Sequence, residues 1–286
     1  MSDVVANGVQ FHVQHLNPPA KSEGAAAERT APPVVFLHGL GMDNMASFYY
    51  TVAGAVAKTG AECVLYDMRG HGSSERPRTG YTMEDSVADL TGILDALEIE
   101  GPVHLIGNSY GGTIALDFAA VSHGRAASLV LIEAHFNVDG WSEQIAAERE
   151  RVAGVVAEMG EENLQAWIRR FGRKVVKMMD ALTDLANHTS FYPDLTRNRP
   201  IPTEALRALT CPIRAVYGER SDVPDYERQL KDLLPHASLT VVEGVGHSVL
   251  MDATPQVREI VLEWLASSEV SRSGVRAAQS SEPDRG

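Results

Sequence analysis

The feature that most constrains this 286-residue chain is a serine held between glycines in the stretch VHLIGNSYGG, positions 103–112. The apolar run at 103–107 predicts a buried strand, and the helix-forming sequence TIALDFAAV follows directly. Glycines on both sides of Ser109 allow the backbone to turn sharply from strand to helix without Cβ clashes. The pattern therefore predicts a tight bend that exposes the Ser109 hydroxyl. Because the same pattern also fits an ordinary glycine-rich turn, its chemistry depends on partners elsewhere in the chain.

A serine hydroxyl becomes a nucleophile when an imidazole takes its proton and a carboxylate orients that imidazole. Asp222 lies in GERSDVPD, just after an apolar run at 213–217, and His247 lies in EGVGHSVLMD, just after another at 239–242. Both positions follow probable parallel strands, whose carboxyl ends meet at one edge of a sheet. We predict Ser109 as nucleophile, His247 as general base and Asp222 as the orienting acid, in the order that accompanies such a bend.

The acid has a second candidate. Glu133 ends the strand-like segment SLVLIEA, and Glu219 and Asp225 share the loop of Asp222. Each of these carboxylates could equally be a surface charge. Since the site needs only one carboxylate within reach of His247, Asp222 is the first choice and Glu133 the alternative.

A tetrahedral oxyanion also requires hydrogen-bond donors that are already in place. The sequence VVFLHGLGMDN at 34–44 predicts a strand followed by a loop, and the helix after Ser109 begins with unpaired amides. The backbone N–H groups of Leu40 and Tyr110 are the candidate oxyanion hole. The alternative is that the His-Gly pair at 38–39 makes only a tight turn.

Together these motifs resemble the Ser-Asp-His group of α/β-hydrolase-fold proteins, which includes esterases, thioesterases, lactonases and carbon-carbon bond hydrolases. The matching segments, spread over about 34–265, are HG at 38–39, DMRGHGSS at 67–74, GNSYGG at 107–112, GERSD at 218–222 and GVGH at 244–247. The resemblance implies a mostly parallel eight-stranded sheet with helices on both faces and an inserted helical cap. It also implies that 67–74 is a structural loop, which leaves His71 outside the site. Asp222 stands one residue later than in many relatives, and the HGLG loop is less glycine-rich than in some.

The predicted organisation is an α/β core at 1–134 and 210–266, a helical cap at 135–209, and a disordered tail at 267–286. Nearly eighty residues with helical periodicity separate the strands on either side of the cap, too many for a plain loop. Helices are expected at 141–159, 161–171, 173–188 and 203–209, with the last connection broken by Pro193, Pro200 and Pro202.

The cap supplies candidate substrate contacts. The predicted apolar wall consists of Met42, Phe136, Trp141, Trp167, Phe171, Met178, Phe191 and Tyr192. The alternative is that many of these side chains only pack cap helices together. A basic stripe, Arg169 to Lys177, suggests an anionic handle on the substrate, such as a carboxylate, a coenzyme A phosphate or an acidic acyl carrier protein. The alternative, which the pattern favours, is a solvated helix face.

Composition narrows the other possibilities. A net charge of −13 argues against nucleic acid or an anionic membrane as partner, and no apolar run approaches the length of a membrane span. The first residues do not resemble a signal peptide, which predicts a cytoplasmic protein. The two cysteines read as buried apolar residues, and no spacing indicates a metal site or a phosphate-binding loop. We therefore expect neither metal nor cofactor.

The predicted activity is hydrolysis of a carboxylic ester or thioester of a mainly apolar small-molecule acyl substrate through an acyl-enzyme on Ser109. The same fold and residues would also suit a carbon-carbon bond hydrolase acting on a β-diketone-like substrate. A non-catalytic ligand-binding protein on this scaffold would need only the pocket.

Overall fold

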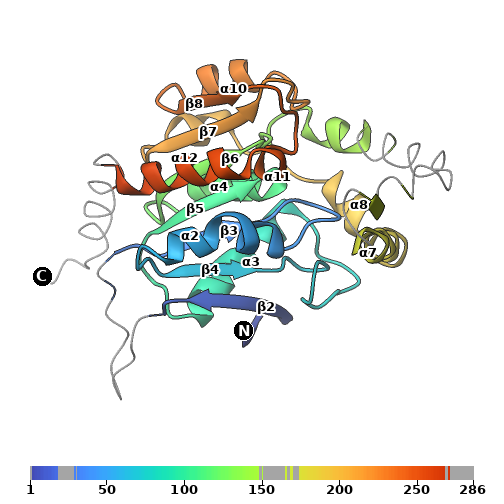
Figure 1. Ribbon diagram of the computed structural model, residues 1–286. Helices are drawn as coiled ribbons and strands as arrows, with labels where there is room; N and C mark the ends of the chain where they lie inside the picture. Colours follow the sequence, from blue (N-terminus) through green and yellow to red (C-terminus); the bar gives the residue numbers. More distant parts are fainter. Residues whose placement is uncertain are drawn as a thin grey trace, which may run out of the picture.

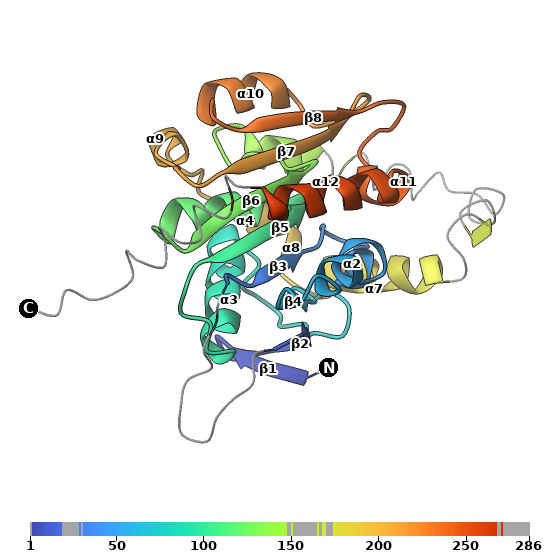
Figure 2. The ribbon, with the colours of Figure 1, turned by 60° about the vertical axis from the view of Figure 1, so that its left-hand side comes forward.

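Eight strands form one sheet, seen from two sides in Figures 1 and 2. The computed structural model describes residues 2–18, 29, 31–147, 150, 165, 168–169, 174–267 and 270. The strands are β1 (Ser2–Ala6), β2 (Val9–Leu16), β3 (Val34–Leu37), β4 (Cys63–Tyr66), β5 (Val103–Asn108), β6 (Ala126–Ile132), β7 (Ile213–Gly218) and β8 (Ser238–Val242). Their order is β1-β2-β4-β3-β5-β6-β7-β8, with β1 and β2 antiparallel to their neighbours and all other pairs parallel.

Helices cover both faces of this sheet, as Figure 1 shows. One group is α3 (Met83–Ala96), α4 (Tyr110–Val121), α9 (Thr203–Arg207) and α10 (Tyr226–Leu233). The other is α1 (Ala46–Phe48), the π-helix η1 (Tyr49–Ala53), α2 (Gly54–Ala57), α11 (Val249–Asp252) and α12 (Thr254–Ala266). Within the first group α4 contacts both α3 and α9, and within the second α12 contacts η1, α2 and α11. The expected fold class is thus confirmed.

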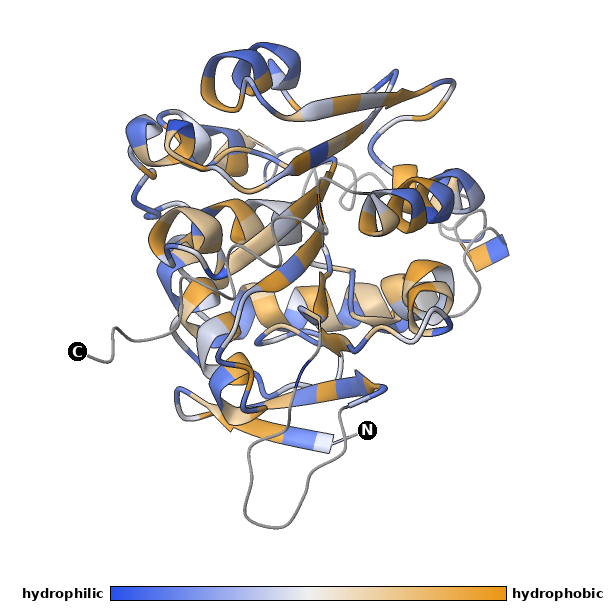
Figure 3. Ribbon diagram, turned by 90° about the vertical axis from the view of Figure 1, so that its left-hand side faces the viewer, coloured by the Kyte–Doolittle hydropathy of each residue, from blue (hydrophilic) through white to orange (hydrophobic). Residues whose placement is uncertain are grey.

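Alternation along the central strands builds two apolar cores, one under each helical layer. On β3, Val35 and Leu37 belong to the core shared with α3 and α4, whereas Val34 and Phe36 belong to the core shared with η1 and α12. Successive side chains of a strand point to opposite faces of the sheet. A strand of apolar residues alone therefore needs to be covered on both faces. In Figure 3 the central strands are largely hydrophobic, while the helices carry both hydrophobic and hydrophilic residues.

The segment between β6 and β7 contains α7 (Lys174–His188), α8 (Phe191–Leu195) and α9. The helix expected at 173–188 is confirmed as α7, and residues 141–147 are helical as expected. The predicted break at Pro193 is wrong, because α8 contains this proline. Pro193 is the third residue of α8, where a backbone N–H would have no partner within the helix. Most of the helices expected at 141–159 and 161–171 and nearly all of the tail lie outside the described residues, although 165, 168 and 169 are helical.

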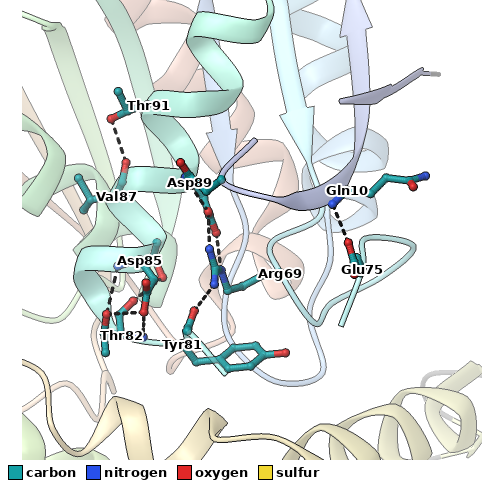
Figure 4. A network of polar contacts seen from close by, with 12 residues as sticks. Gln10, Arg69, Glu75, Tyr81, Thr82, Asp85, Val87, Asp89 and Thr91 are labelled. Carbon is teal, nitrogen blue, oxygen red and sulfur yellow. Dashed lines mark hydrogen bonds and ion pairs between the residues drawn. The ribbon is translucent and has the colours of Figure 1, made fainter. Parts of the chain in front are cut away.

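A buried ion pair fastens the loop after β4 to α3, as Figure 4 shows. Arg69 donates through Nε and Nη2 to the two carboxylate oxygens of Asp89, and through Nη1 to the Gly80 carbonyl. Thr82 and Asp85 form a capping box that starts α3 beside this pair. The loop that contains Arg69 therefore has a structural function.

No helix in the described ranges has the combination of length and apolar character that crossing a bilayer demands.

Candidate active site

Ser109 occupies a strained bend between β5 and α4. Its φ of 52° and ψ of −118° are unusual for a residue with a side chain. The bend is packed too closely for other residues at its glycines: a Cβ on Gly107 would lie 2.4 Å from Gly111, and one on Gly111 would lie 2.1 Å from the Leu37 carbonyl oxygen. The Ser109 amide donates to the Ile132 carbonyl at 2.7 Å, which ties the bend to β6. The strained, closely packed backbone thus presents the Ser109 hydroxyl at the carboxyl end of the sheet.

His247 reaches this hydroxyl from the loop after β8. Its Nε2 lies 3.0 Å from Ser109 Oγ, a hydrogen-bond distance across 138 positions of sequence. The loop can approach because β7 ends in glycine: a Cβ on Gly218 would lie 2.5 Å from the Val245 carbonyl oxygen. The Arg220 amide also donates to that oxygen at 2.9 Å. The two predicted residues are therefore in contact, with an imidazole nitrogen facing the hydroxyl.

Two carboxylates lie against the other imidazole nitrogen. His247 Nδ1 is 3.0 Å from Asp222 Oδ1 and 3.2 Å from Glu133 Oε2. Nδ1 makes no well-aligned hydrogen bond to either oxygen, so both contacts are ion pairs in geometry. The first-choice acid and its alternative are thus brought to the same atom.

The environments of these carboxylates differ strongly. The Glu133 side chain is fully buried, whereas that of Asp222 is 64% exposed. Glu133 accepts hydrogen bonds from the Gly218 amide at 2.5 Å and from Ser221 Oγ at 2.6 Å. Glu133 has a left-handed backbone conformation, with a φ of 52°, directly after the end of β6. A charge buried to this degree needs such donors, and they hold the carboxylate in place.

The ion pairs change the protonation of the imidazole. Burial by itself would lower the pKa of His247, but the contacts with Asp222 and Glu133 outweigh it and raise this pKa to about 9. The contact with His247 in turn lowers the pKa of the Asp222 carboxyl. The two carboxylates therefore favour the protonated form of the imidazole.

The two amides predicted to form an oxyanion hole have no hydrogen-bond acceptor among the described residues. Within the described part of the chain, neither the Leu40 nor the Tyr110 N–H donates a hydrogen bond. The amides on either side of Leu40 are both occupied: Gly39 donates to Asp43 Oδ2 at 2.7 Å and Gly41 donates to His71 Nε2 at 2.9 Å. Leu40 N–H is thus left unused in a loop that is held at both ends.

His71 contacts the Leu40 loop, which the sequence did not indicate. It is buried, its Nδ1 donates to the Arg69 carbonyl at 2.9 Å, and its Nε2 accepts from the Gly41 amide. Burial, with the nearby His38 as a smaller cause, lowers the pKa of His71 to about 3, so the ring stays neutral and can accept. The motif DMRGHGSS marked the loop as structural, but only coordinates reveal that it supports the Leu40 loop.

The predicted apolar wall divides into two groups. Phe136, Trp141 and Phe191 are almost completely buried in the larger core. Trp141 packs on Tyr110, with ring centroids 6.5 Å apart, and Phe191 packs on the rings of His71, Tyr81 and Tyr192. Met42, Met178 and Tyr192 are half-buried. Trp167 and Phe171 lie outside the described residues. Contact of any of these side chains with substrate stays a prediction.

Of the basic stripe, only Arg169 and Lys177 have described side chains, and both are exposed.

The described residues contain one cluster with the geometry of metal ligands, and it consists of Glu133, Asp222 and His247. These are the groups already in contact in the candidate site, and His247 Nε2 is directed at Ser109 rather than toward the carboxylates.

Comparison with known proteins agrees with this fold. Residues 34–260 match the alpha/beta hydrolase family. The chain is 26% identical over 247 residues to a non-heme chloroperoxidase of Streptomyces lividans, covering 78% of this chain and 87% of that protein. It is 27% identical over 257 residues to a 2-hydroxymuconate semialdehyde hydrolase of a Pseudomonas species, covering 84% and 88%. The crystal structure of an enol-lactonase from Burkholderia xenovorans is similar at a TM-score of 0.68 and 19% identity, covering 93% of this chain and 100% of that one.

Proposed function

Because this chain belongs to the alpha/beta hydrolase family, we propose that it is a serine hydrolase that cleaves a carboxylic ester or thioester through an acyl-enzyme on Ser109. The observation that carries the proposal is the 3.0 Å contact between Ser109 Oγ and His247 Nε2, which joins a nucleophile to a base. A protein that merely bound a ligand would not need this contact or the strained backbone beneath it.

In the proposed reaction Ser109 Oγ attacks the substrate carbonyl carbon and its proton passes to His247 Nε2. Asp222 and Glu133 stabilise the imidazolium that forms. The carbonyl oxygen, now an oxyanion, accepts hydrogen bonds from the Leu40 and Tyr110 amides. His247 then returns the proton to the leaving alkoxide or thiolate, and the tetrahedral centre collapses to the acyl-enzyme.

The second half of the cycle uses the same groups. Water gives a proton to His247 while its oxygen attacks the acyl-enzyme carbonyl. As the tetrahedral intermediate collapses, His247 returns this proton to Ser109 Oγ, and the carboxylic acid is released. The half-buried side chains of Met42 and Leu182, at the Leu40 loop, support an apolar acyl group. Leu182 lies against this loop, since a Cβ on Gly41 would be 3.5 Å from its Cδ1.

A carbon-carbon bond hydrolase is the second candidate. It is favoured by the 27% identity to the 2-hydroxymuconate semialdehyde hydrolase, which aligns over most of both chains. The leaving group would then be a carbanion equivalent instead of an alkoxide, and His247 would have to protonate carbon.

Two measurements test the proposal. Wild-type protein should be labelled covalently at Ser109 by a fluorophosphonate, and Ser109→Ala should not. Turnover of an aryl ester, an acyl thioester and a β-diketone then separates the two reactions. Labelling at another residue, or none, would refute the serine mechanism, and turnover of the β-diketone alone would select the second candidate.

A further inference from the structure

The described polar contacts of His247 act at the edge of its ring. Nε2 lies 3.0 Å from Ser109 Oγ, and Nδ1 lies 3.0 Å and 3.2 Å from oxygens of Asp222 and Glu133. The His247 side chain is 36% exposed and stands on a loop with glycines at 244 and 246, which add backbone freedom. Contacts in the plane of a ring do not by themselves stop the ring from tilting, so a precise orientation also needs a neighbour that packs against the imidazole.

His135 is such a neighbour. The ring centroids of His135 and His247 are 5.8 Å apart and the ring planes are inclined by 50°, which is the spacing of packed aromatic pairs. His135 follows the end of β6 and its side chain is half-buried. Its backbone is held by α4, because the His135 carbonyl accepts a hydrogen bond from Thr113 Oγ1 at 3.0 Å. The ring that contacts His247 therefore stands on a segment anchored to the helix that follows Ser109.

The His135 ring is itself packed against a deeply buried ring. Trp141 is 2% exposed and meets His135 edge to face, with centroids 5.4 Å apart. Trp141 in turn stacks on Tyr110, at 6.5 Å and an interplanar angle of 20°. Tyr110 is 4% exposed, and its hydroxyl lies 3.2 Å from Ser86 Oγ on α3. Since closely packed interiors leave large rings little room to move, this row of four rings connects the His247 imidazole to the core.

His135 also lies close enough to the exposed acid to affect it. The contact with His247 is the main reason that the pKa of the Asp222 carboxyl is lowered, and the nearby charge of His135 lowers this pKa further. His135 is therefore close to both members of the His247–Asp222 pair.

We propose that His135 is a positioning residue for the reaction: the packing of its ring keeps the His247 imidazole directed at Ser109 Oγ. This inference rests on the proposed function, in which His247 is the base. His135 acts through the shape of its ring and takes no proton in the reaction. Another flat ring of similar size should therefore replace it, whereas a small side chain should not.

The test compares His135→Ala and His135→Phe in the full chain, with steady-state kinetics on one aryl ester. We expect His135→Ala to lower kcat by about 10- to 100-fold with KM little changed, because a misplacement of about 1 Å in a catalytic group can cost about 100-fold. His135→Phe keeps a ring against His247, so its kcat should stay within about threefold of the wild type. A wild-type kcat in His135→Ala, or a kcat in His135→Phe as low as that of His135→Ala, would overturn the proposal.

His104→Ala is the control for a general loss of stability. It removes another imidazole, which is buried in the first half of β5 with Nδ1 2.9 Å from Ser128 Oγ. Ser109 lies beyond the opposite end of this strand. This variant should lower the melting temperature and leave kcat and KM unchanged. If His104→Ala loses as much kcat as His135→Ala, the effect is one of stability and the positioning role is refuted.

A second readout does not depend on the proposed function. In Ser109→Ala protein with ¹³C-labelled histidine, relaxation of the Cε1 nucleus reports the motion of each of the ten imidazoles, and His247→Gln identifies the His247 signal by its loss. Adding His135→Ala to Ser109→Ala should make the His247 ring more mobile, and adding His135→Phe should not. This result would support the contact even if the protein hydrolysed no ester. An equally ordered His247 ring in the His135→Ala background would contradict the proposal even in an active esterase.

Discussion

Glu133 and His247 are in direct contact, with Oε2 of a fully buried glutamate 3.2 Å from Nδ1 of the imidazole. The exposed Asp222 lies 3.0 Å from the same nitrogen. One imidazole is thus shared by a carboxylate that is held by protein donors and one that faces solvent. Glu133 is fixed by the Gly218 amide and the Ser221 hydroxyl, which gives it the better-defined position of the two.

The first prediction concerns these two carboxylates. Since each lies at Nδ1, Glu133→Gln and Asp222→Asn should each lower kcat/KM by about 10- to 100-fold, while the double variant should lose about 10,000-fold, as expected when an imidazole loses its orienting acid. Steady-state kinetics on one aryl ester measures all three. Circular dichroism and thermal melting confirm that each variant is folded.

One outcome would show that the acid is not shared. If either single variant alone loses as much activity as the double variant, that residue orients His247 and the other carboxylate is only a neighbouring charge.

The second prediction concerns pH. The raised pKa of His247, about 9, means that the neutral imidazole able to accept a proton accumulates only as pH rises through this value. The rate of fluorophosphonate labelling of Ser109 should therefore climb on the alkaline side of neutrality. In Asp222→Asn one negative charge is lost, so the pKa of His247 falls and the profile should move to lower pH. A wild-type profile already flat above pH 7 would contradict the assignment.

Much of this site could be predicted because it depends on strand order and local backbone. Parallel strands end at one edge, so residues directly after β5, β7 and β8 were expected at the same edge, and the glycines around Ser109 allow a tight bend. The meeting of Ser109, His247 and Asp222 at one edge could be predicted in this way, but not the distances between them. Neighbouring strands also made Glu133 a reasonable alternative.

Other features depend on side-chain packing and could not be predicted. That Glu133 and Asp222 both reach Nδ1 depends on the path of the loop after β7 and on a positive φ at Glu133, neither of which the sequence reveals. Support of Gly41 by His71 joins two loops that are thirty positions apart. Pro193 shows the same limit. In the sequence, a proline in the first turn of a helix cannot be distinguished from one that ends a helix.

The third prediction tests how the Leu40 loop is held. His71→Leu removes the acceptor of the Gly41 amide, and a buried unpaired N–H costs about 1–3 kcal/mol. If this disturbs the Leu40 donor, kcat should fall by about 10- to 100-fold with KM little changed, since the oxyanion forms only during the reaction. His71→Gln, which can offer a side-chain oxygen to the amide, should recover part of the loss. Equal activity in His71→Leu and the wild type would show that the loop does not need this contact.

The fourth prediction concerns the glycines of the bend. Gly111→Ala places a methyl group where a Cβ would be 2.1 Å from the Leu37 carbonyl oxygen, a backbone atom that cannot move without opening the sheet beside β5. We expect this variant to be destabilised by more than about 3 kcal/mol or to fail to fold, a cost in the upper range for overpacking. Gly101→Ala is the matched control, because no atom lies within 4 Å of its Cβ position, and its stability should change by less than about 1 kcal/mol. Urea unfolding monitored by tryptophan fluorescence compares the two. A Gly111→Ala protein as stable as Gly101→Ala would mean that the bend can relax, and the close packing that exposes the Ser109 hydroxyl would no longer be required by the fold.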